Sequence, residues 1–166
     1  KLNVSSSAAM QSKEPRILIA GCGTGSQVLS TAGLFPKADI TAVDLSTRSL
    51  AYAKQKLLEY GIENVHLYHC DILDVEKLAG NFDIIECVGV LHHMAEPLEG
   101  LGVLLTKLRP LGLLRLGLYS KIARQQISKI REHNTLSNIS FTPEIARAVR
   151  QKLMSSENNS SNIILR

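Results

Sequence analysis

The chain has 166 residues, of which 45% are hydrophobic and 20% are charged, and its formal net charge is +4 at pH 7. This length supports one domain with its own core, and this composition is ordinary for a globular protein. No apolar run approaches the roughly 18 residues that a membrane span requires, and no signal peptide opens the sequence. These features exclude a membrane-spanning protein and predict a domain that has no membrane partner.

The charge is unevenly distributed along the chain. Residues 1–106 carry 8 Lys and Arg against 12 Asp and Glu, whereas residues 107–166 carry 11 against 3. A basic final third can meet RNA or an acidic partner, or it can be the solvated face of two helices. The second interpretation is favoured, because Tyr119 and Phe141 are the only aromatic residues there that could stack on bases.

The three cysteines, Cys22, Cys70 and Cys87, lie at or near the ends of expected strands. Their spacing fits no zinc-binding pattern, so no metal site is expected. Free thiols of this kind are typical of the reducing cytoplasm, which is the predicted location.

Apolar runs, helical periodicity and turn residues predict a regular order of elements. The expected strands are 16–20, 39–43, 65–70, 82–88 and 113–119, and the expected helices are 26–34, 46–61, 75–78 and 97–108. Ser46 should cap its helix at the N-terminus and Gly61 should end it. Strands that alternate with helices predict a mostly parallel sheet covered on both faces, which is a three-layer α/β fold.

The two ends of the chain differ from this pattern. Residues 1–14 are polar and serine-rich, and predict a flexible leader or linker before a domain at 15–154. From about residue 121 that domain is expected to be helical, over 121–132 and over 143–154, with Thr142 as an N-cap. Residues 155–166 predict a mobile tail.

The most informative segment is a glycine-rich loop followed by a carboxylate. Residues 17–25 read Ile-Leu-Ile-Ala-Gly-Cys-Gly-Thr-Gly, and Asp44 ends a second apolar run nineteen positions later. Glycines let the backbone turn sharply and approach a ligand closely, and a carboxylate can accept hydrogen bonds from ribose hydroxyls. The two runs therefore predict neighbouring parallel strands with a nucleotide-like cofactor across their ends.

This segment resembles the first motif of class I S-adenosylmethionine-dependent methyltransferases, a family with a Rossmann-like fold. Asp44 falls where the family's ribose-binding acid falls, and residues 70–73, Cys-Asp-Ile-Leu, resemble the segment that faces the adenine. The resemblance implies S-adenosyl-L-methionine as cofactor. The residues it assigns to cofactor binding are Ala20, Gly21, Cys22, Gly23, Thr24, Gly25, Asp44, Leu45, Asp71, Ile72, Glu86 and Cys87.

Two later segments extend the resemblance over residues 15–120. Residues 82–93, ending in Val-Gly-Val-Leu-His-His, resemble the fourth motif of small-molecule methyltransferases. Residues 108–113 resemble the segment that leads into the family's fifth strand, although Leu111-Gly112 replaces the usual Gly-Gly. The Asn/Asp-Pro-Pro-Tyr motif of amino methyltransferases is absent after residue 85, which argues against an adenine or glutamine acceptor.

His92 and His93 are the candidate catalytic residues, because they fall where the acceptor approaches the methyl group in the family. A histidine there could take a proton from a hydroxyl, and the alternative is that both residues only cap the strand and line the pocket. Methyl transfer needs few protein groups, because the cofactor is already a strong electrophile. The motifs therefore leave the acceptor undetermined.

The C-terminus departs from the family pattern, because no convincing pair of final strands follows Tyr119. The chain is therefore expected either to be a fragment of a larger multidomain protein or to have replaced that strand hairpin. Two other functions stay open: a non-catalytic module that binds the cofactor, and an NAD-dependent oxidoreductase on a similar fold. The spacing Gly21-x-Gly23-x-Gly25 argues against the oxidoreductase.

Overall fold

A computed structural model describes residues 14–120 and the single positions 122, 142, 144, 145, 147 and 151. The chain divides into two units, Lys1–Ser120 and Lys121–Arg166, and only the first is described continuously. The predictions for the two ends of the chain lie largely or wholly outside the described residues. They concern the leader, the C-terminal helices, the absence of a final strand hairpin and the tail. Among the single described positions, the amide of Ile145 donates a hydrogen bond to Thr142 Oγ1 at 3.4 Å, as expected if Thr142 is an N-cap.

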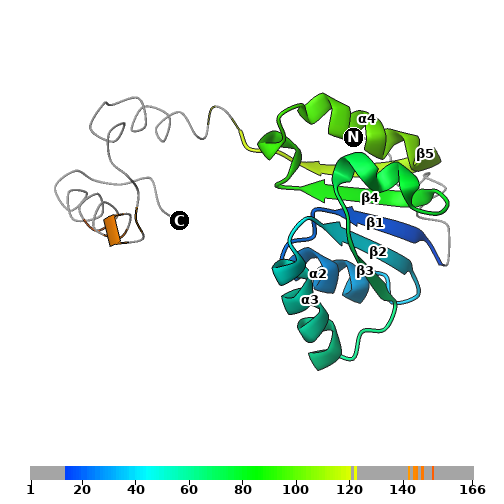
Figure 1. The fold of residues 1–166 in the computed structure, drawn as a ribbon. Helices are drawn as coiled ribbons and strands as arrows, with labels where there is room; N and C mark the ends of the chain where they lie inside the picture. Colours follow the sequence, from blue (N-terminus) through cyan, green and yellow to red (C-terminus); the bar gives the residue numbers. More distant parts are fainter. Residues whose placement is uncertain are drawn as a thin grey trace. The chain divides into compact units, whose positions relative to one another are not determined.

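The first unit alternates strands and helices in the expected order (Figure 1). The strands are β1 (Arg16–Ala20), β2 (Asp39–Asp44), β3 (Val65–His69), β4 (Phe82–Val88) and β5 (Leu108–Gly117). The α-helices are α2 (Ser26–Leu34), α3 (Thr47–Glu59) and α4 (Pro97–Thr106), and two 3₁₀ turns are η2 (Ile72–Lys77) and η3 (Leu91–His93). All strand pairs are parallel, in the order β3-β2-β1-β4-β5. The predicted Rossmann-like architecture is confirmed.

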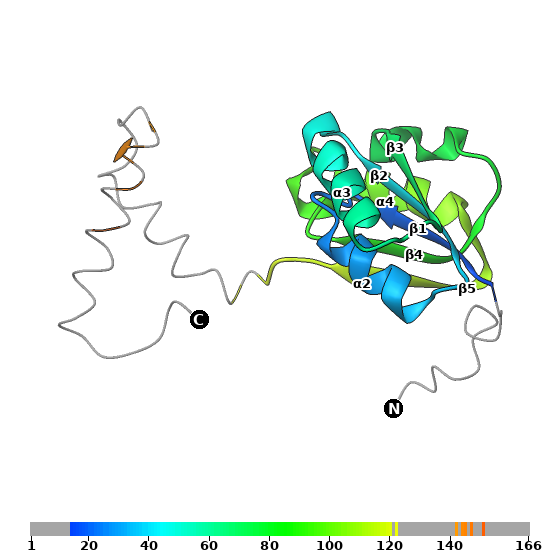
Figure 2. The same cartoon turned by 90° about the horizontal axis from the view of Figure 1, so that it is seen from below.

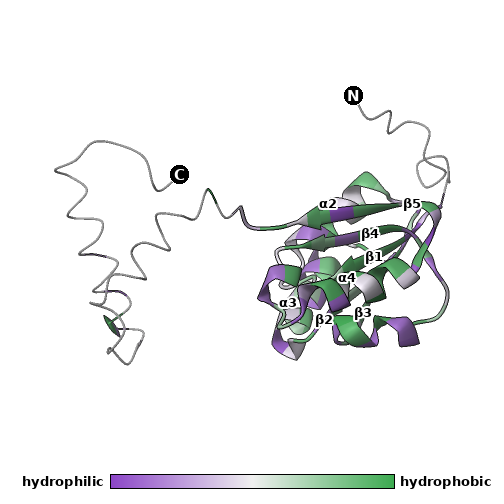
Figure 3. Ribbon diagram, turned by 90° about the horizontal axis from the view of Figure 1, so that it is seen from above, coloured by the Kyte–Doolittle hydropathy of each residue, from purple (hydrophilic) through white to green (hydrophobic). Residues whose placement is uncertain are grey.

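Two apolar layers cover the two faces of this sheet. Alternate residues of β1 point to opposite sides, so that Ile17 and Ile19 pack toward α2 and α3, whereas Leu18 and Ala20 pack toward η2, η3 and α4. Figures 2 and 3 show these helices around the sheet, whose inner strands are predominantly hydrophobic. Among the described residues, no helix is long and apolar enough to cross a membrane.

The ends of α3 follow from local sequence chemistry. Ser46 Oγ accepts a hydrogen bond from the Ser49 amide at 3.1 Å, which satisfies one of the free donors of the first turn. Gly61 follows the helix with φ +63°, and the Ile62 amide donates to the Leu57 carbonyl at 2.9 Å. This is a Schellman ending, which requires a left-handed residue. Both expected caps are confirmed.

The helix expected at 75–78 is instead the turn η2, which begins at Ile72. Ile72 and Val75 are both buried against the sheet, so the turn starts directly after β3. Its N-cap is Asp71, whose Oδ1 accepts a hydrogen bond from the Leu73 amide at 3.0 Å. Asp74 directly precedes the helix expected at 75–78, where it could have been the cap, but in the structure its carboxylate pairs with Lys77.

The last two elements also differ in their bounds. Helix α4 ends at Thr106 rather than Leu108, and β5 runs from Leu108 to Gly117 rather than from 113 to 119. Pro110 and Gly112 predict a break, but a register shift between β4 and β5 and a left-handed Leu111 (φ +63°) keep the strand continuous. Proline is tolerated here because β5 is an edge strand of the described sheet.

Candidate functional site

A cavity of about 420 Å³ opens where parallel strands of the sheet end. Its volume lies in the range of small-molecule sites. Loops after β1, β2, β3 and β4 contribute its walls, as expected for a ligand site on an open parallel sheet. The lining residues are Gly21, Asp44, Leu45, Cys70, Asp71, Ile72, Leu73, Val90, His93, Met94 and Ala95.

The glycine loop after β1 has the backbone that its sequence requires. Gly21, Gly23 and Gly25 have φ values of +76°, +53° and +91°, a region that side chains disfavour. The amides of Gly21 and Cys22 both donate to the Val43 carbonyl at 2.9 Å, which ties the loop to β2. Among the described residues, no atom outside Gly23 and its two chain neighbours lies within 4 Å of the position that a Cβ of Gly23 would take, so the loop stays open there.

Asp44 joins the ends of β1 and β2. Its Oδ2 accepts a hydrogen bond from the Gly23 amide at 2.7 Å, and its Oδ1 accepts one from the Ser46 amide at 2.8 Å. Each carboxylate oxygen can accept two hydrogen bonds. Asp44 is half-buried and lines the cavity, so its remaining acceptor sites are available to a ligand.

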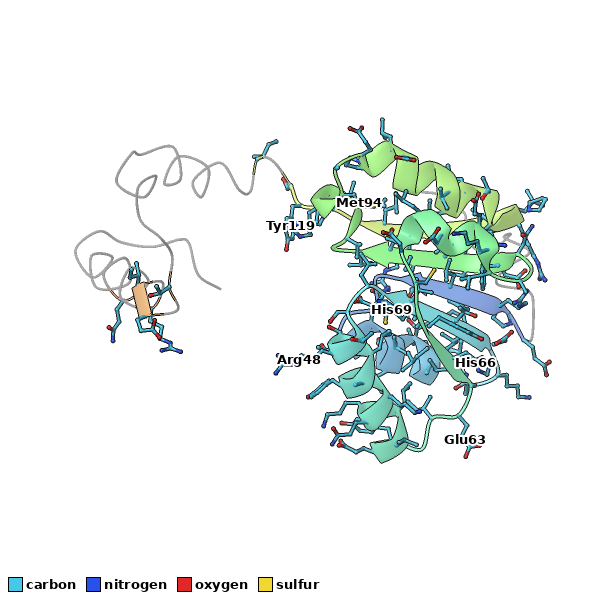
Figure 4. The ribbon with its side chains drawn as sticks, viewed as in Figure 1. Arg48, Glu63, His66, His69, Met94 and Tyr119 are labelled. Atoms are coloured by element: carbon cyan, nitrogen blue, oxygen red, sulfur yellow. The ribbon has the colours of Figure 1, made fainter. Side chains whose placement is uncertain are left out.

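The end of β3 holds the loop after β2 in place. The Cys70 amide donates to the Asp44 carbonyl at 3.2 Å, and His69 Nε2 lies 2.9 Å from the Leu45 carbonyl oxygen. Because a carbonyl can only accept, this His69 nitrogen carries the proton. Figure 4 labels His69 near the cavity end of β3 and His66 near the strand's beginning.

Asp71 is a cavity residue and a helix cap at once. Its Oδ1 holds the Leu73 amide, which fixes the orientation of the carboxylate at the cavity wall. Ile72 lies beneath it, buried among the apolar side chains of that face. The segment that was expected to face the adenine therefore forms the β3 side of the cavity.

Glu86 lies elsewhere, on the sheet face that α2 covers. Its Oε2 accepts hydrogen bonds from Thr31 Oγ1 at 2.7 Å and from Gln27 Nε2 at 2.8 Å, and its Oε1 pairs with Arg115 at 3.0 Å. The carboxylate is buried and fully paired, as a buried charge must be. It supports the first turns of α2 rather than the cavity wall.

The remaining predicted cofactor residues surround the loop without lining the cavity. Ala20 and Cys87 are completely buried beneath it, Gly25 is the N-cap of α2, and Thr24 is exposed. Burial, and after it the nearby Asp44 carboxylate, raises the pKa of the Cys22 thiol to about 11. Burial also raises the pKa of Cys87 to about 11, so both thiols stay protonated and unreactive at neutral pH.

The two histidines have different positions after β4. His93 is exposed and lines the cavity, and its ring meets that of Tyr119 edge to face at 5.6 Å between centroids. His92 packs between them, with its centroid 4.2 Å from His93 and 4.0 Å from Tyr119. Of the two candidate bases, only His93 is a lining residue.

Sequence reasoning missed Val90, Met94 and Ala95, which form the β4 wall of the cavity. Val90 packs against Gly21, where any Cβ would collide with it. Glycine at position 21 therefore serves the contact between two loops. The apolar pattern after β4 carries no signal that would separate these residues from ordinary core positions.

Comparison with known proteins identifies the class to which this fold and cavity belong. Residues 11–161 match a family described as a methyltransferase domain. The chain belongs to this family, and its fold is that of the class I S-adenosylmethionine-dependent methyltransferases.

Two curated relatives and one solved structure illustrate the similarity. An uncharacterized protein of Synechococcus sp. is 43% identical over 125 residues, covering 75% of this chain and 30% of the relative. The ubiquinone biosynthesis O-methyltransferase of Aromatoleum aromaticum is 29% identical over 148 residues, covering 82% and 62% respectively. PKMT2 from Rickettsia typhi in complex with AdoHcy aligns with TM-score 0.69 and 28% identity over 90% of this chain and 30% of that one. The chain thus spans less than a third of two of these proteins.

The residues present fit an S-adenosyl cofactor. Gly21 of the glycine loop and Asp44 both line the cavity, the Asp44 carboxylate is held in place with acceptor sites still unused, and the cavity is large enough for a ligand of this size. Asp71 adds a second fixed carboxylate from β3. These groups come from the loops after three different strands and meet at one cavity.

Proposed function

We propose that this chain binds S-adenosylmethionine in the cavity and transfers its methyl group to an acceptor. The observation that carries the proposal is the convergence of the glycine loop, Asp44 and Asp71 on one cavity at the ends of parallel strands. The family to which the chain belongs supports it.

Each cavity wall has a proposed task. The free acceptor sites of Asp44 take the ribose hydroxyls, while its bonds to Gly23 and Ser46 keep the carboxylate in position. Asp71 accepts from the adenine amino group through acceptor sites that the Leu73 amide does not use. Leu45 and Ile72 frame the base.

In this proposal, four of the predicted residues support the glycine loop from beneath: Glu86, Ala20, Cys22 and Cys87. Glu86 holds Gln27 in the first turn of α2, directly after the glycine loop. Because α2 begins at Ser26, fixing that turn also fixes Thr24 and Gly25. These residues therefore shape the site without lining its cavity.

His93 is the proposed base for a hydroxyl acceptor. The bound cofactor supplies an electrophilic methyl group, so the chain must only orient the acceptor and remove its proton. His93 lines the cavity, and an imidazole nitrogen there can accept the proton of a bound hydroxyl. The Aromatoleum relative is named an O-methyltransferase, which fits a hydroxyl as the methylated group.

A transfer experiment tests the proposal. The chain is incubated with cofactor labelled in its methyl group and with a cell extract, alongside the Asp44→Ala variant. The proposal expects labelled product with the wild-type chain and much less with the variant. Cofactor binding without any transfer would contradict it and would leave a non-catalytic binding module.

A further inference from the structure

Gly100, in the first half of α4, lies directly against Met94. A Cβ at position 100 would lie 2.6 Å from Met94 Sδ, 2.8 Å from Met94 Cε and 3.1 Å from Leu91 Cδ2. Real Cβ atoms do not come this close to sulfur or carbon, so the Met94 thioether occupies the space that a side chain of α4 would need. Because position 100 is a glycine, the Met94 side chain has room to pack against α4 there.

The Met94 side chain is also part of the cavity wall. Met94 is half-buried and follows η3, and its amide donates to the Leu91 carbonyl at 3.1 Å, so its backbone is fixed. Leu91, on the other side of the contact, is 3% exposed and has no room to withdraw. Methionine has three rotatable side-chain bonds. A group added at position 100 would therefore push the thioether toward the open side, which is the cavity.

Other loops also contribute apolar side chains to the cavity. Leu45 comes from the loop after β2 and Leu73 from η2, and both are exposed leucines that line the same cavity. Together with Met94, these two leucines line an apolar part of the cavity, which we call the slot. A thioether packs well at the edge of an aromatic ring, so an apolar space of this kind suits a planar base. The width of this slot depends on where Met94 lies.

We infer that Gly100 is a positioning residue for the cofactor, because it holds Met94 back and so sets the width of the slot that receives the adenosine group. The inference rests on the proposed function and deepens it. Gly100 does not line the cavity, and it acts only through Met94.

The test compares four variants for binding of S-adenosylhomocysteine by calorimetry, with thermal unfolding measured in parallel. Gly100→Ala should raise the dissociation constant about tenfold, because the displaced Met94 side chain would take up part of the space for the ligand. Gly102→Ala is the matched control in the same helix and should leave binding unchanged, because no described atom beyond its chain neighbours and the backbone of its own helix lies within 4 Å of its Cβ position. Met94→Ala combined with Gly100→Ala should bind as Met94→Ala alone does, because the side chain that would be displaced is gone.

The outcomes separate the two proposals. A wild-type chain that does not bind S-adenosylhomocysteine contradicts both the proposed function and this inference. Normal binding by folded Gly100→Ala overturns the inference alone, and so does a double variant that binds more weakly than Met94→Ala. If Gly100→Ala fails to fold, the double variant must still fold, since it lacks the contact with the Met94 thioether. A double variant that also fails to fold overturns the inference.

Discussion

The Asp44 carboxylate accepts a hydrogen bond from the Gly23 amide at 2.7 Å and so connects the ends of two neighbouring strands. The contact joins residues 21 positions apart in the sequence. It orients the carboxylate before any ligand arrives, which lowers the cost of ordering the site on binding. The predictions that follow depend on this preorganised edge of the sheet.

Asp44→Ala should weaken binding of S-adenosylhomocysteine by about 1.5–3 kcal/mol, since a charged acceptor of two hydroxyls is lost. This corresponds to roughly a ten- to hundredfold increase in the dissociation constant, measured by calorimetry. Asp39→Ala is the control on the same strand, because Asp39 is exposed at the start of β2 and pairs with Arg16. Equal affinities for the two variants would remove Asp44 from the site.

Gly23→Ala should abolish cofactor binding while the domain remains folded. Forcing alanine into a left-handed conformation costs about 1–2 kcal/mol, and its Cβ would occupy the open space beside the loop. Gly61→Ala is the matched control, since Gly61 is also left-handed with open space around it but ends α3 away from the cavity. Both variants should lose similar stability in thermal unfolding, and only Gly23→Ala should lose binding. Loss of binding in both would mean that destabilisation alone explains the effect.

Asp71→Asn should weaken cofactor binding with little loss of stability. The asparagine side chain keeps an oxygen that can accept from the Leu73 amide, so the cap survives while the charge is lost. Asp74→Asn removes only an exposed pair with Lys77 and should change neither binding nor the unfolding temperature measurably. The reverse pattern in calorimetry would show that the β3 side of the cavity has been assigned to the wrong carboxylate.

His93→Gln should lower turnover by about 10²-fold or more at saturating cofactor, with little change in cofactor affinity, because a positioned base is lost. His66→Gln is the control, since His66 lies near Asp39 at the other end of the sheet. Steady-state rates require an acceptor, which the labelled-product experiment would provide. Turnover that is unchanged in His93→Gln would rule out a base at this position and leave catalysis by orientation alone.

Most of the fold could be predicted from the sequence, because its strands are short apolar runs that end in glycine or a carboxylate. The start of β5 could not, since Pro110 and Gly112 predict a break that the register shift beside β4 removes. The start of η2 could not be predicted either: the sequence predicts a helix at 75–78, but the turn begins at Ile72, whose side chain is buried against the sheet. In both places a tertiary contact overrides a local signal.

In the candidate site too, some residues could be predicted from local sequence signals and others depend on tertiary contacts. Asp44, Asp71 and the glycine loop are set by local chemistry at strand ends, and the sequence predicts their positions. Glu86 was grouped with them, but alternation along β4 turns its side chain toward α2, where Thr31 and Gln27 bind it. Met94 could not be predicted, because its place in the cavity wall and its packing on Gly100 are tertiary contacts that no sequence period encodes.

The central claim is that the cavity beside Asp44 binds an S-adenosyl cofactor, and one calorimetric comparison tests it most directly. S-adenosylhomocysteine and NAD are titrated separately into the wild-type chain and into Asp44→Ala. The account predicts saturable binding of S-adenosylhomocysteine by the wild-type chain, a ten- to hundredfold weaker affinity in Asp44→Ala, and no comparable binding of NAD. Binding of NAD in preference to S-adenosylhomocysteine, or binding of S-adenosylhomocysteine that Asp44→Ala leaves unchanged, would contradict it.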